Sequence, residues 1–218
     1  MTRHLRRRLG HVYAALRGWL FDMRYRVETR GVEPIDTLTV PQNHAKDAVQ
    51  YEPIYPEEME EILARVAIDF SEYTFVDFGS GKGRAMFVAS NYPFRRILGV
   101  EFARELHEIA CRNIRTYRSH NQKCFDIVSI HEDATAFELP TEPVVLYFNN
   151  PFRGQVMEAV VTNVKRSLEA APRPALVLSY GRWTLNGVIE RLPEIRLQSR
   201  GRFYSIYQIP PYSCLVKS

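Results

Sequence analysis

The sequence predicts an α/β domain whose doubly wound, mostly parallel sheet ends in an antiparallel hairpin, with helices on both faces. Short apolar runs alternate with stretches of helical periodicity through most of the chain, which is typical of a parallel sheet covered on both sides. Near the end, two β-prone runs flank Gly201 and indicate a hairpin. With 218 residues, 45% of them hydrophobic, the chain has the size and balance of one globular domain plus an extension.

The expected elements follow one another in a regular order. A helix should begin at Pro56, because proline suits the first helical turn and the carboxylates of Glu57 and Glu58 complement its positive end. Strands are expected at residues 73–78, 97–101, 126–130, 144–148 and 175–180, helices at about 84–90, 103–117 and 154–169, and the hairpin at 195–198 and 203–209.

The net charge of +4 is unevenly distributed along the chain. Residues 1–30 hold eight arginines against one aspartate and one glutamate, a local excess of six positive charges, so the remainder carries a net charge of −2. The basic character therefore belongs to the N-terminal segment and does not by itself indicate nucleic-acid binding. We expect residues 1–50 to form a basic N-terminal helix and an irregular crossing segment, and residues 51–218 to form the main domain.

An apolar stripe at helical spacing runs through the basic segment. Its members are Leu5, Leu9, Val12, Leu16, Leu20 and Met23. The simplest interpretation is a helix that packs this stripe on the domain and leaves its arginines in water. Attachment to an anionic membrane surface and contact with an acidic partner are the alternatives, and nucleic acid is disfavoured as that partner by the negative main domain.

Two further patterns concern the cell compartment. No uninterrupted apolar run is long enough to cross a membrane. The three cysteines are odd in number and lack the spacing of a zinc site or a disulfide framework. A reducing, cytoplasmic location and no bound metal are therefore expected.

A glycine-rich turn, Gly79-Ser80-Gly81-Lys82-Gly83, follows the first expected strand. Glycines let the backbone approach a ligand, and the next helix directs its free N–H groups to the same place. Glu101 ends the second strand, where a carboxylate can accept both hydroxyls of a ribose. The spacing excludes a phosphate-binding P-loop, and Arg84 stands where a dinucleotide fingerprint needs its third glycine. Asp77, before the turn, would repel a pyrophosphate and suits a ligand with a cationic ammonium.

These residues resemble the motifs of the class I S-adenosylmethionine-dependent methyltransferases over about residues 51–180. Val76 to Arg84 is similar to the first motif, Gly99-Val100-Glu101 to the second, and Glu132-Asp133-Ala134 to the third, whose acid usually contacts the adenine amino group. The resemblance implies a Rossmann-like sheet of seven strands, the last one antiparallel, and S-adenosylmethionine as cofactor. The cofactor-binding residues it implies are Tyr51, Asp77, Gly79, Ser80, Gly81, Gly83, Glu101, Phe102, Asp133, Ala134 and Asn149.

The segment Asn149-Asn150-Pro151-Phe152 follows the fourth strand. It resembles the Asp/Asn/Ser-Pro-Pro-Tyr/Phe segment of class I enzymes that methylate nitrogen, with Asn150 in place of the first proline. It is also similar to the Asn-Asn-Phe segment of the histone-lysine methyltransferases that lack a SET domain. We expect Asn149 to position the nucleophile and Asn150, Pro151 and Phe152 to shape the pocket. Phe152 would stack on a flat substrate or close a lysine channel by a cation–π contact.

The sequence therefore predicts an S-adenosylmethionine-dependent methyltransferase that modifies nitrogen, with a protein lysine as the leading acceptor. A small-molecule amine or a nucleobase is the alternative acceptor. A catalytically inactive, cofactor-binding scaffold that acts through the basic helix also stays open. Tyr180 and Trp183, after the fifth strand, are expected to line the substrate side.

Overall fold

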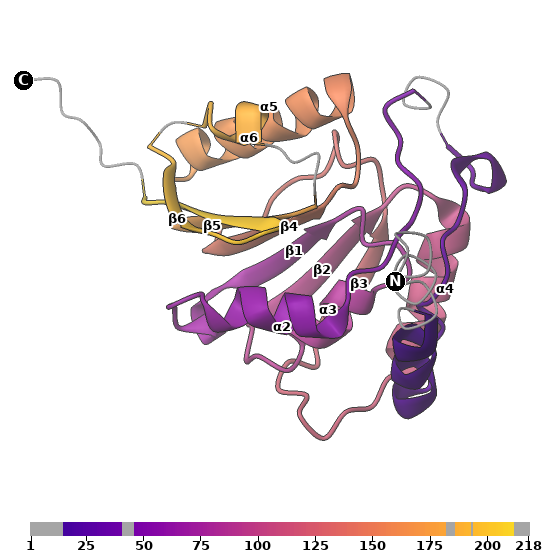
Figure 1. Ribbon diagram of the computed structural model, residues 1–218. Helices are drawn as coiled ribbons and strands as arrows, with labels where there is room; N and C mark the ends of the chain where they lie inside the picture. The colour runs from indigo at the N-terminus through magenta and orange to yellow at the C-terminus, as the bar shows by residue number, and fades with distance from the viewer. Residues whose placement is uncertain (1–14, 41–45, 182–185, 193, 212–218) are drawn as a thin grey trace, which may run out of the picture.

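One seven-stranded sheet organises the chain, of which this computed structural model describes residues 15–40, 46–181, 186–192 and 194–211 (Figure 1). The strands are β1 (Thr74–Phe78), β2 (Arg96–Glu101), β3 (Ile127–His131), β4 (Val144–Asn149), β5 (Ala175–Tyr180), β6 (Arg196–Arg200) and β7 (Tyr204–Ile209). Their order is β3-β2-β1-β4-β5-β7-β6; β1 to β5 run parallel, and β7 runs antiparallel to β5 and β6. The predicted seven-stranded, mostly parallel sheet with a terminal hairpin is confirmed.

Helices cover both faces of this sheet (Figure 1). They are α2 (Pro56–Ala64), α3 (Arg84–Ala89), α4 (Arg104–Thr116), α5 (Gly154–Ala170) and α6 (Asn186–Ile189), with short 3-10 turns at η1 (Ile35–Thr37) and η2 (Phe70–Glu72). Residues 15–25 form a further helix, called the N-terminal helix below. Two hydrophobic clusters form, one beneath α2 and α3 and the other beneath α5, because each parallel strand is apolar on both sides.

The predicted elements agree with the observed ones to within one or two residues at most ends. Helix α2 begins at Pro56, and its apolar side chains Met59, Ile62 and Leu63 are fully buried. Strand β1 is buried along its whole length, as expected for a central strand. Among the described helices, none is long and apolar enough to cross a bilayer.

The N-terminal helix corrects one expectation. Leu16, Leu20 and Met23 of the predicted stripe are 50%, 51% and 62% exposed, whereas Phe21 and Asp22 are buried. The helix presents this other face to the domain because Asp22 Oδ1 lies 3.6 Å from Arg84 Nη2, and its carboxylate also accepts the Thr29 N–H at 3.0 Å. The interpretation that the stripe packs on the domain is therefore wrong for these three residues. Leu5, Leu9 and Val12 lie outside the described residues.

Residues 46–53, called the crossing segment below, run over the carboxyl ends of the strands. Asp47 accepts the Arg153 N–H through its carbonyl at 2.8 Å and the Gln155 N–H through Oδ2 at 3.0 Å, which ties the segment to the start of α5. Tyr51 forms a backbone bridge with Glu33. The crossing segment therefore closes one side of the edge at which parallel sheets bind ligands.

Candidate cofactor and acceptor site

The glycine-rich turn lies at the end of β1, between the crossing segment and the turn after β4. Gly79 and Gly81 have φ angles of 71° and 54°, the left-handed region that favours glycine. A Cβ on Gly79 would lie 2.4 Å from Pro151 Cβ, and one on Gly81 would lie 2.2 Å from the Tyr51 ring. Both glycines are therefore required by backbone conformation and by close packing.

Gly81→Ala is expected to lower the free energy of unfolding by about 2 kcal/mol or more, because it combines a strained φ angle with a clash against an aromatic ring. Chemical denaturation measures the change. Gly187→Ala is the matched control, since no atom of the described residues lies within 4 Å of the Cβ it would add, and it should leave stability unchanged or slightly raised. Equal losses in the two variants would contradict this reading of the turn.

Two buried carboxylates face the turn. Asp77 and Glu101 are 2% and 4% exposed. Glu101 accepts the Gly81 N–H at 2.8 Å and the Ala103 N–H at 2.9 Å. Burial raises the pKa of Glu101 to about 7, and burial together with the Glu101 charge raises the pKa of Asp77 to about 8. A cation bound beside them would lower both pKa values and would itself be held strongly.

Two hydroxyl groups add to this polar lining. Within the described part of the chain, Ser80 Oγ and Tyr147 OH are buried without a hydrogen-bond partner. Both residues line the same cavity as Asp77 and Glu101. Because buried polar groups are normally paired, these hydroxyls point to a polar ligand in this place.

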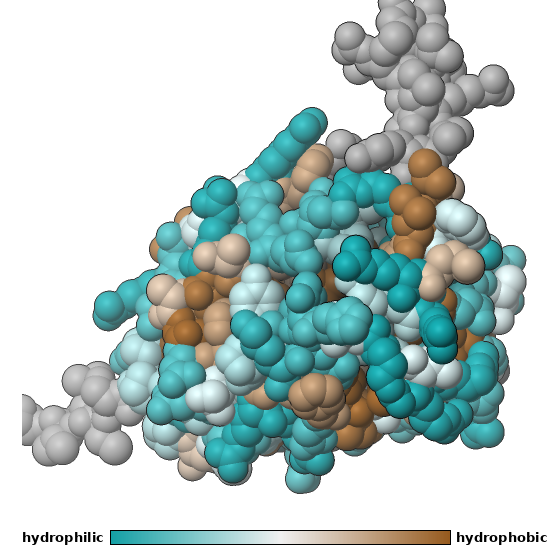
Figure 2. All heavy atoms as spheres, turned by 90° about the horizontal axis from the view of Figure 1, so that it is seen from below, coloured by the Kyte–Doolittle hydropathy of each residue, from teal (hydrophilic) through white to brown (hydrophobic). Residues whose placement is uncertain are grey.

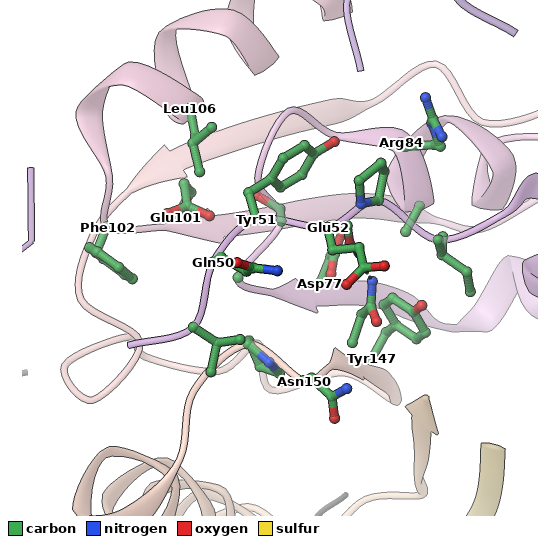
Figure 3. Close-up of a pocket in the computed structure, with 18 of the residues that line it drawn as sticks. Gln50, Tyr51, Glu52, Asp77, Arg84, Glu101, Phe102, Leu106, Tyr147 and Asn150 are labelled. Atoms are coloured by element: carbon green, nitrogen blue, oxygen red, sulfur yellow. Dashed lines mark hydrogen bonds between the residues drawn. The ribbon is translucent and has the colours of Figure 1, made fainter. Parts of the chain in front are cut away.

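Two cavities meet at the carboxyl edge of the sheet. The first, called the cofactor cleft below, holds about 50 Å³ beside Asp77 and Glu101. In Figure 3, Tyr51 and Gln50 of the crossing segment lie between these two acids. The second, called the acceptor cavity below, holds about 980 Å³. Both cavities are lined by Val49, Gln50, Glu52, Pro53, Asn149 and Asn150. A ligand in one cavity can therefore meet a ligand in the other beside the two asparagines.

Solved structures share this architecture, although no family model and no curated protein matches the chain. The putative methyltransferase yhhF from Escherichia coli aligns over 79% of this chain and 91% of its own, with a TM-score of 0.51 and 18% identity. Precorrin-6y C5,15-methyltransferase from Geobacter metallireducens aligns over 80% of this chain and 94% of its own, with a TM-score of 0.50 and 15% identity. A predicted N6-adenine-specific DNA methylase from Listeria monocytogenes aligns over 73% of this chain and 52% of its own, with a TM-score of 0.51 and 14% identity. The chain has the Rossmann-like methyltransferase fold.

In this methyltransferase fold, Asn149 lies at the junction of the two cavities. Its side-chain Nδ2 donates to the Glu52 carbonyl at 3.1 Å. That contact occupies one of the two amide N–H groups and identifies Oδ1 as the side-chain acceptor. Asn150 has a φ of 46°. A Cβ on Gly181 would lie 2.0 Å from the side-chain nitrogen of Asn150. Gly181 therefore leaves the room that the second asparagine occupies.

Phe152 lies apart from the acceptor cavity. It is buried and lines a small pocket of about 20 Å³ with Phe102, Asp133 and Ala134. Its backbone pairs with Ala48 of the crossing segment. The structure therefore does not bring Phe152 to the side where it was expected to stack on a substrate or close a lysine channel.

The same small pocket collects the residues of the third motif. Asp133 Oδ1 accepts the Thr135 N–H and hydroxyl, both at 2.8 Å, which fixes the carboxylate. Phe102 lines this pocket and the cofactor cleft alike, so the two adjoin. Gly83, with a φ of 92°, caps α3 and lines neither the cleft nor this pocket, so it contributes through the shape of the turn.

Tyr51 connects the N-terminal segment to the glycine-rich turn. Its hydroxyl donates to the Thr29 carbonyl at 2.7 Å, and Lys82 Nζ lies 5.6 Å from the centre of its ring. Thr29 Oγ1 in turn accepts from Arg84 Nε at 2.7 Å. The position of Tyr51 over Gly81 is thus set by Thr29 of the N-terminal segment and by Lys82 of the glycine-rich turn.

Sequence reasoning missed most of the acceptor cavity. Its charged and aromatic lining includes Asp36, Glu52, Tyr55, Glu58, Arg153 and Tyr180. Of these, Tyr180 was expected on the substrate side, and its hydroxyl donates to the Glu58 carboxylate. The run of tyrosines and glutamates at residues 51–58 is the signal that could have found Tyr55 and Glu58. Trp183 lies outside the described residues.

Proposed function

We propose that this protein transfers a methyl group from S-adenosylmethionine to the side-chain amine of a protein lysine. The observation that carries the proposal is the position of Asn149, which lines both the cofactor cleft and an acidic, tyrosine-lined acceptor cavity. The fold of the chain supports methyl transfer, and the lining of the acceptor cavity supports the choice of acceptor.

The cofactor cleft fits S-adenosylmethionine in its chemistry. Asp77 would hold the ammonium group, and Glu101 would accept the ribose hydroxyls, since an ionised carboxylate has lone pairs beyond those used by Gly81 and Ala103. Asp133 and Phe102 would hold the adenine in the small adjoining pocket. When bound, the cofactor supplies a methyl group on a positively charged sulfur, which a neutral amine can displace.

The acceptor cavity favours a cation. Three carboxylates line it, from Asp36, Glu52 and Glu58, against one arginine, Arg153, among the described lining residues. This charge balance attracts a lysine ammonium and opposes the phosphates of a nucleic acid. Tyr55 and Tyr180 offer aromatic faces that stabilise a cation further.

Asn149 then prepares the amine for reaction. Its Oδ1 accepts an N–H of the neutral amine, which turns the nitrogen lone pair away from the asparagine and toward the cofactor cleft. The amine must lose a proton before it reacts, and the carboxylates of the open acceptor cavity can accept it. Alignment of this kind supplies much of the rate of a direct displacement.

Cofactor affinity is expected to rise with pH up to about 8. An ionised Asp77 is needed to pair with the ammonium group, and its pKa of about 8 means that it holds a proton at lower pH. Binding must therefore displace that proton. Affinity should rise by up to about tenfold per pH unit between about pH 7 and 8, more steeply below pH 7 where Glu101 also holds a proton, and level off above about pH 8. Calorimetry in buffers of different ionisation enthalpy measures the proton release. Affinity that is flat from pH 6 to about 8 would contradict this assignment.

Glu58→Gln is expected to raise the KM for a lysine peptide by about tenfold, because it removes a carboxylate that faces the cationic acceptor. The matched control is Glu158→Gln, which removes an exposed carboxylate paired with Arg191 and should leave KM unchanged. Steady-state kinetics with both variants make the comparison. Equal KM values in wild type and Glu58→Gln would remove Glu58 from the acceptor site.

The direct test uses S-adenosylmethionine labelled with tritium in the methyl group. The full chain is incubated with cell extract proteins, with total RNA, with DNA and with small amines in separate reactions. Protein label that yields methyllysine on hydrolysis is the expected result. Label that only nuclease releases, or that stays with small amines, overturns the choice of acceptor. Cofactor binding without transfer to any of the four overturns the enzymatic proposal in favour of a scaffold.

A further inference from the structure

The N-terminal helix carries an apolar stripe on its outer face. Leu16, Trp19, Leu20 and Met23 are 50%, 41%, 51% and 62% exposed, and their spacing places them on one side of a helix. Figure 2 shows hydrophobic side chains on the surface where this helix lies. Single exposed apolar residues are ordinary on a protein surface, but a contiguous stripe of this kind marks an interaction site.

The inner face holds this helix firmly on the domain. Phe21 is buried beneath the Arg84 guanidinium, whose carbon lies 5.3 Å from the ring centre. A Cβ on Gly18 would lie 3.4 Å from Arg84 Nη2, so the helix approaches closely. The stripe is therefore presented by a fixed helix, and little conformational freedom remains to be lost when a partner binds.

Positive charge is in excess along the segment that carries the stripe, although Glu57 and Glu60 lie beside Leu20 and Arg24. Arg24, Arg26 and Arg30 are exposed on and after the helix, and the sequence before it contributes Arg3, Arg6, Arg7 and Arg8 without any aspartate or glutamate. A second copy of this segment would bring like charges together. A nucleic acid would pair with the arginines but would leave the four apolar side chains in water. A bilayer that contains anionic lipids satisfies both features at once.

We propose that the N-terminal helix docks the protein on an anionic lipid bilayer, with the stripe of Leu16, Trp19, Leu20 and Met23 inserted at the interface and the arginines on the lipid headgroups. Tryptophan is favoured at this depth, and apolar burial adds to the electrostatic attraction. Asp22 and Arg84 join the back of the same helix to the glycine-rich turn, so docking holds the methyltransferase domain at the membrane surface. This inference does not depend on the acceptor.

Flotation of the full chain with lipid vesicles tests the proposal. One set of vesicles is phosphatidylcholine alone, and the other contains about one third phosphatidylglycerol. The protein is expected to float with the anionic vesicles and to stay behind with the neutral ones. Leu16→Ser/Leu20→Ser/Met23→Ser should weaken vesicle affinity by about tenfold or more. The chain has two tryptophans, so the variant Trp183→Phe keeps only Trp19. The fluorescence emission of Trp19 should shift to shorter wavelength when this variant binds the anionic vesicles.

The matched control is Phe125→Ser/Leu197→Ser, which removes two apolar side chains that are 77% and 49% exposed elsewhere. It should float like the wild type, and both serine variants should keep the wild-type melting temperature because the replaced side chains are exposed. Equal flotation with both vesicle types, or flotation unaffected by the triple variant, overturns the proposal. So does a stable dimer in solution that the triple variant converts to a monomer, since the occupant of the stripe is then a second copy.

Discussion

Asp77→Asn is expected to weaken S-adenosylmethionine binding by about a hundredfold and at the same time to make the protein more stable at pH 7. The loss of affinity follows from removing the charge that pairs with the cofactor ammonium, an interaction of about 3 kcal/mol when desolvated. The gain in stability follows from the burial of Asp77, which is 2% exposed and has its pKa raised to about 8.

The sign of the stability change depends on pH. The unfolded chain releases the Asp77 proton near pH 4, whereas the folded protein keeps it until about pH 8. Between these values the folded state binds more protons, so Asp77 makes wild-type stability fall as pH rises. The amide of the variant does not titrate. Its advantage in melting temperature should therefore be absent near pH 4 and grow toward pH 8.

Asp69→Asn is the matched control for this pair of measurements. Asp69 is exposed, and hydrogen bonds from Ser71 lower its pKa, so this variant should bind the cofactor normally and lose a little stability at neutral pH. Calorimetry and thermal melts over the pH range give both quantities. If Asp77→Asn lowered the melting temperature as well as the affinity, Asp77 would be a structural residue and the cofactor assignment would lose its main support.

Local patterns in the sequence were enough to predict the fold and to place Asp77, the glycine-rich turn and Glu101 together at one edge of the sheet. The apolar runs that became β1 and β4 are buried over nearly their whole length, so each run alone carried the information. The glycine-rich turn and Glu101 lie one strand apart in sequence, and parallel strand pairing brings Asp77 beside Gly99, two residues before Glu101. A motif that lies within one strand, turn and helix can be recognised from the sequence, because the geometry of that local unit places its residues.

The acceptor side could not be predicted in the same way. Glu58 and Tyr180 are 122 residues apart and meet only because α2 and the end of β5 converge. The N-terminal helix was oriented wrongly for a related reason. Helical periodicity alone placed the apolar stripe against the domain, whereas the buried face carries Asp22, whose charge is satisfied by Thr29 and Arg84. Such pairings depend on tertiary contacts for which the helical periodicity holds no signal.

Asn149→Ala is expected to lower kcat by about a hundredfold while S-adenosylmethionine affinity changes by less than about threefold. Removal of a single positioning hydrogen bond at a reacting centre has an effect of this size. The amide is held by the Glu52 carbonyl at 3.1 Å, so its Oδ1 has a defined direction at the junction of the two cavities. The small effect on affinity follows because Asp77, Glu101 and the glycine-rich turn, which would hold the cofactor, are untouched.

Single-turnover kinetics with labelled cofactor, together with calorimetry, separate the two effects. Gln50→Ala is the matched control, because Gln50 also carries a side-chain amide and lines the same two cavities. Its loss should reduce kcat by less than about tenfold, since no nitrogen of the acceptor is expected to depend on it. If Asn149→Ala turned over at the wild-type rate, or if it lost cofactor affinity and kcat in equal measure, Asn149 would not be the residue that positions the amine. The nucleophile would then have to be held by the carboxylates of the acceptor cavity, and Glu58→Gln would lower kcat where it is now expected to raise KM.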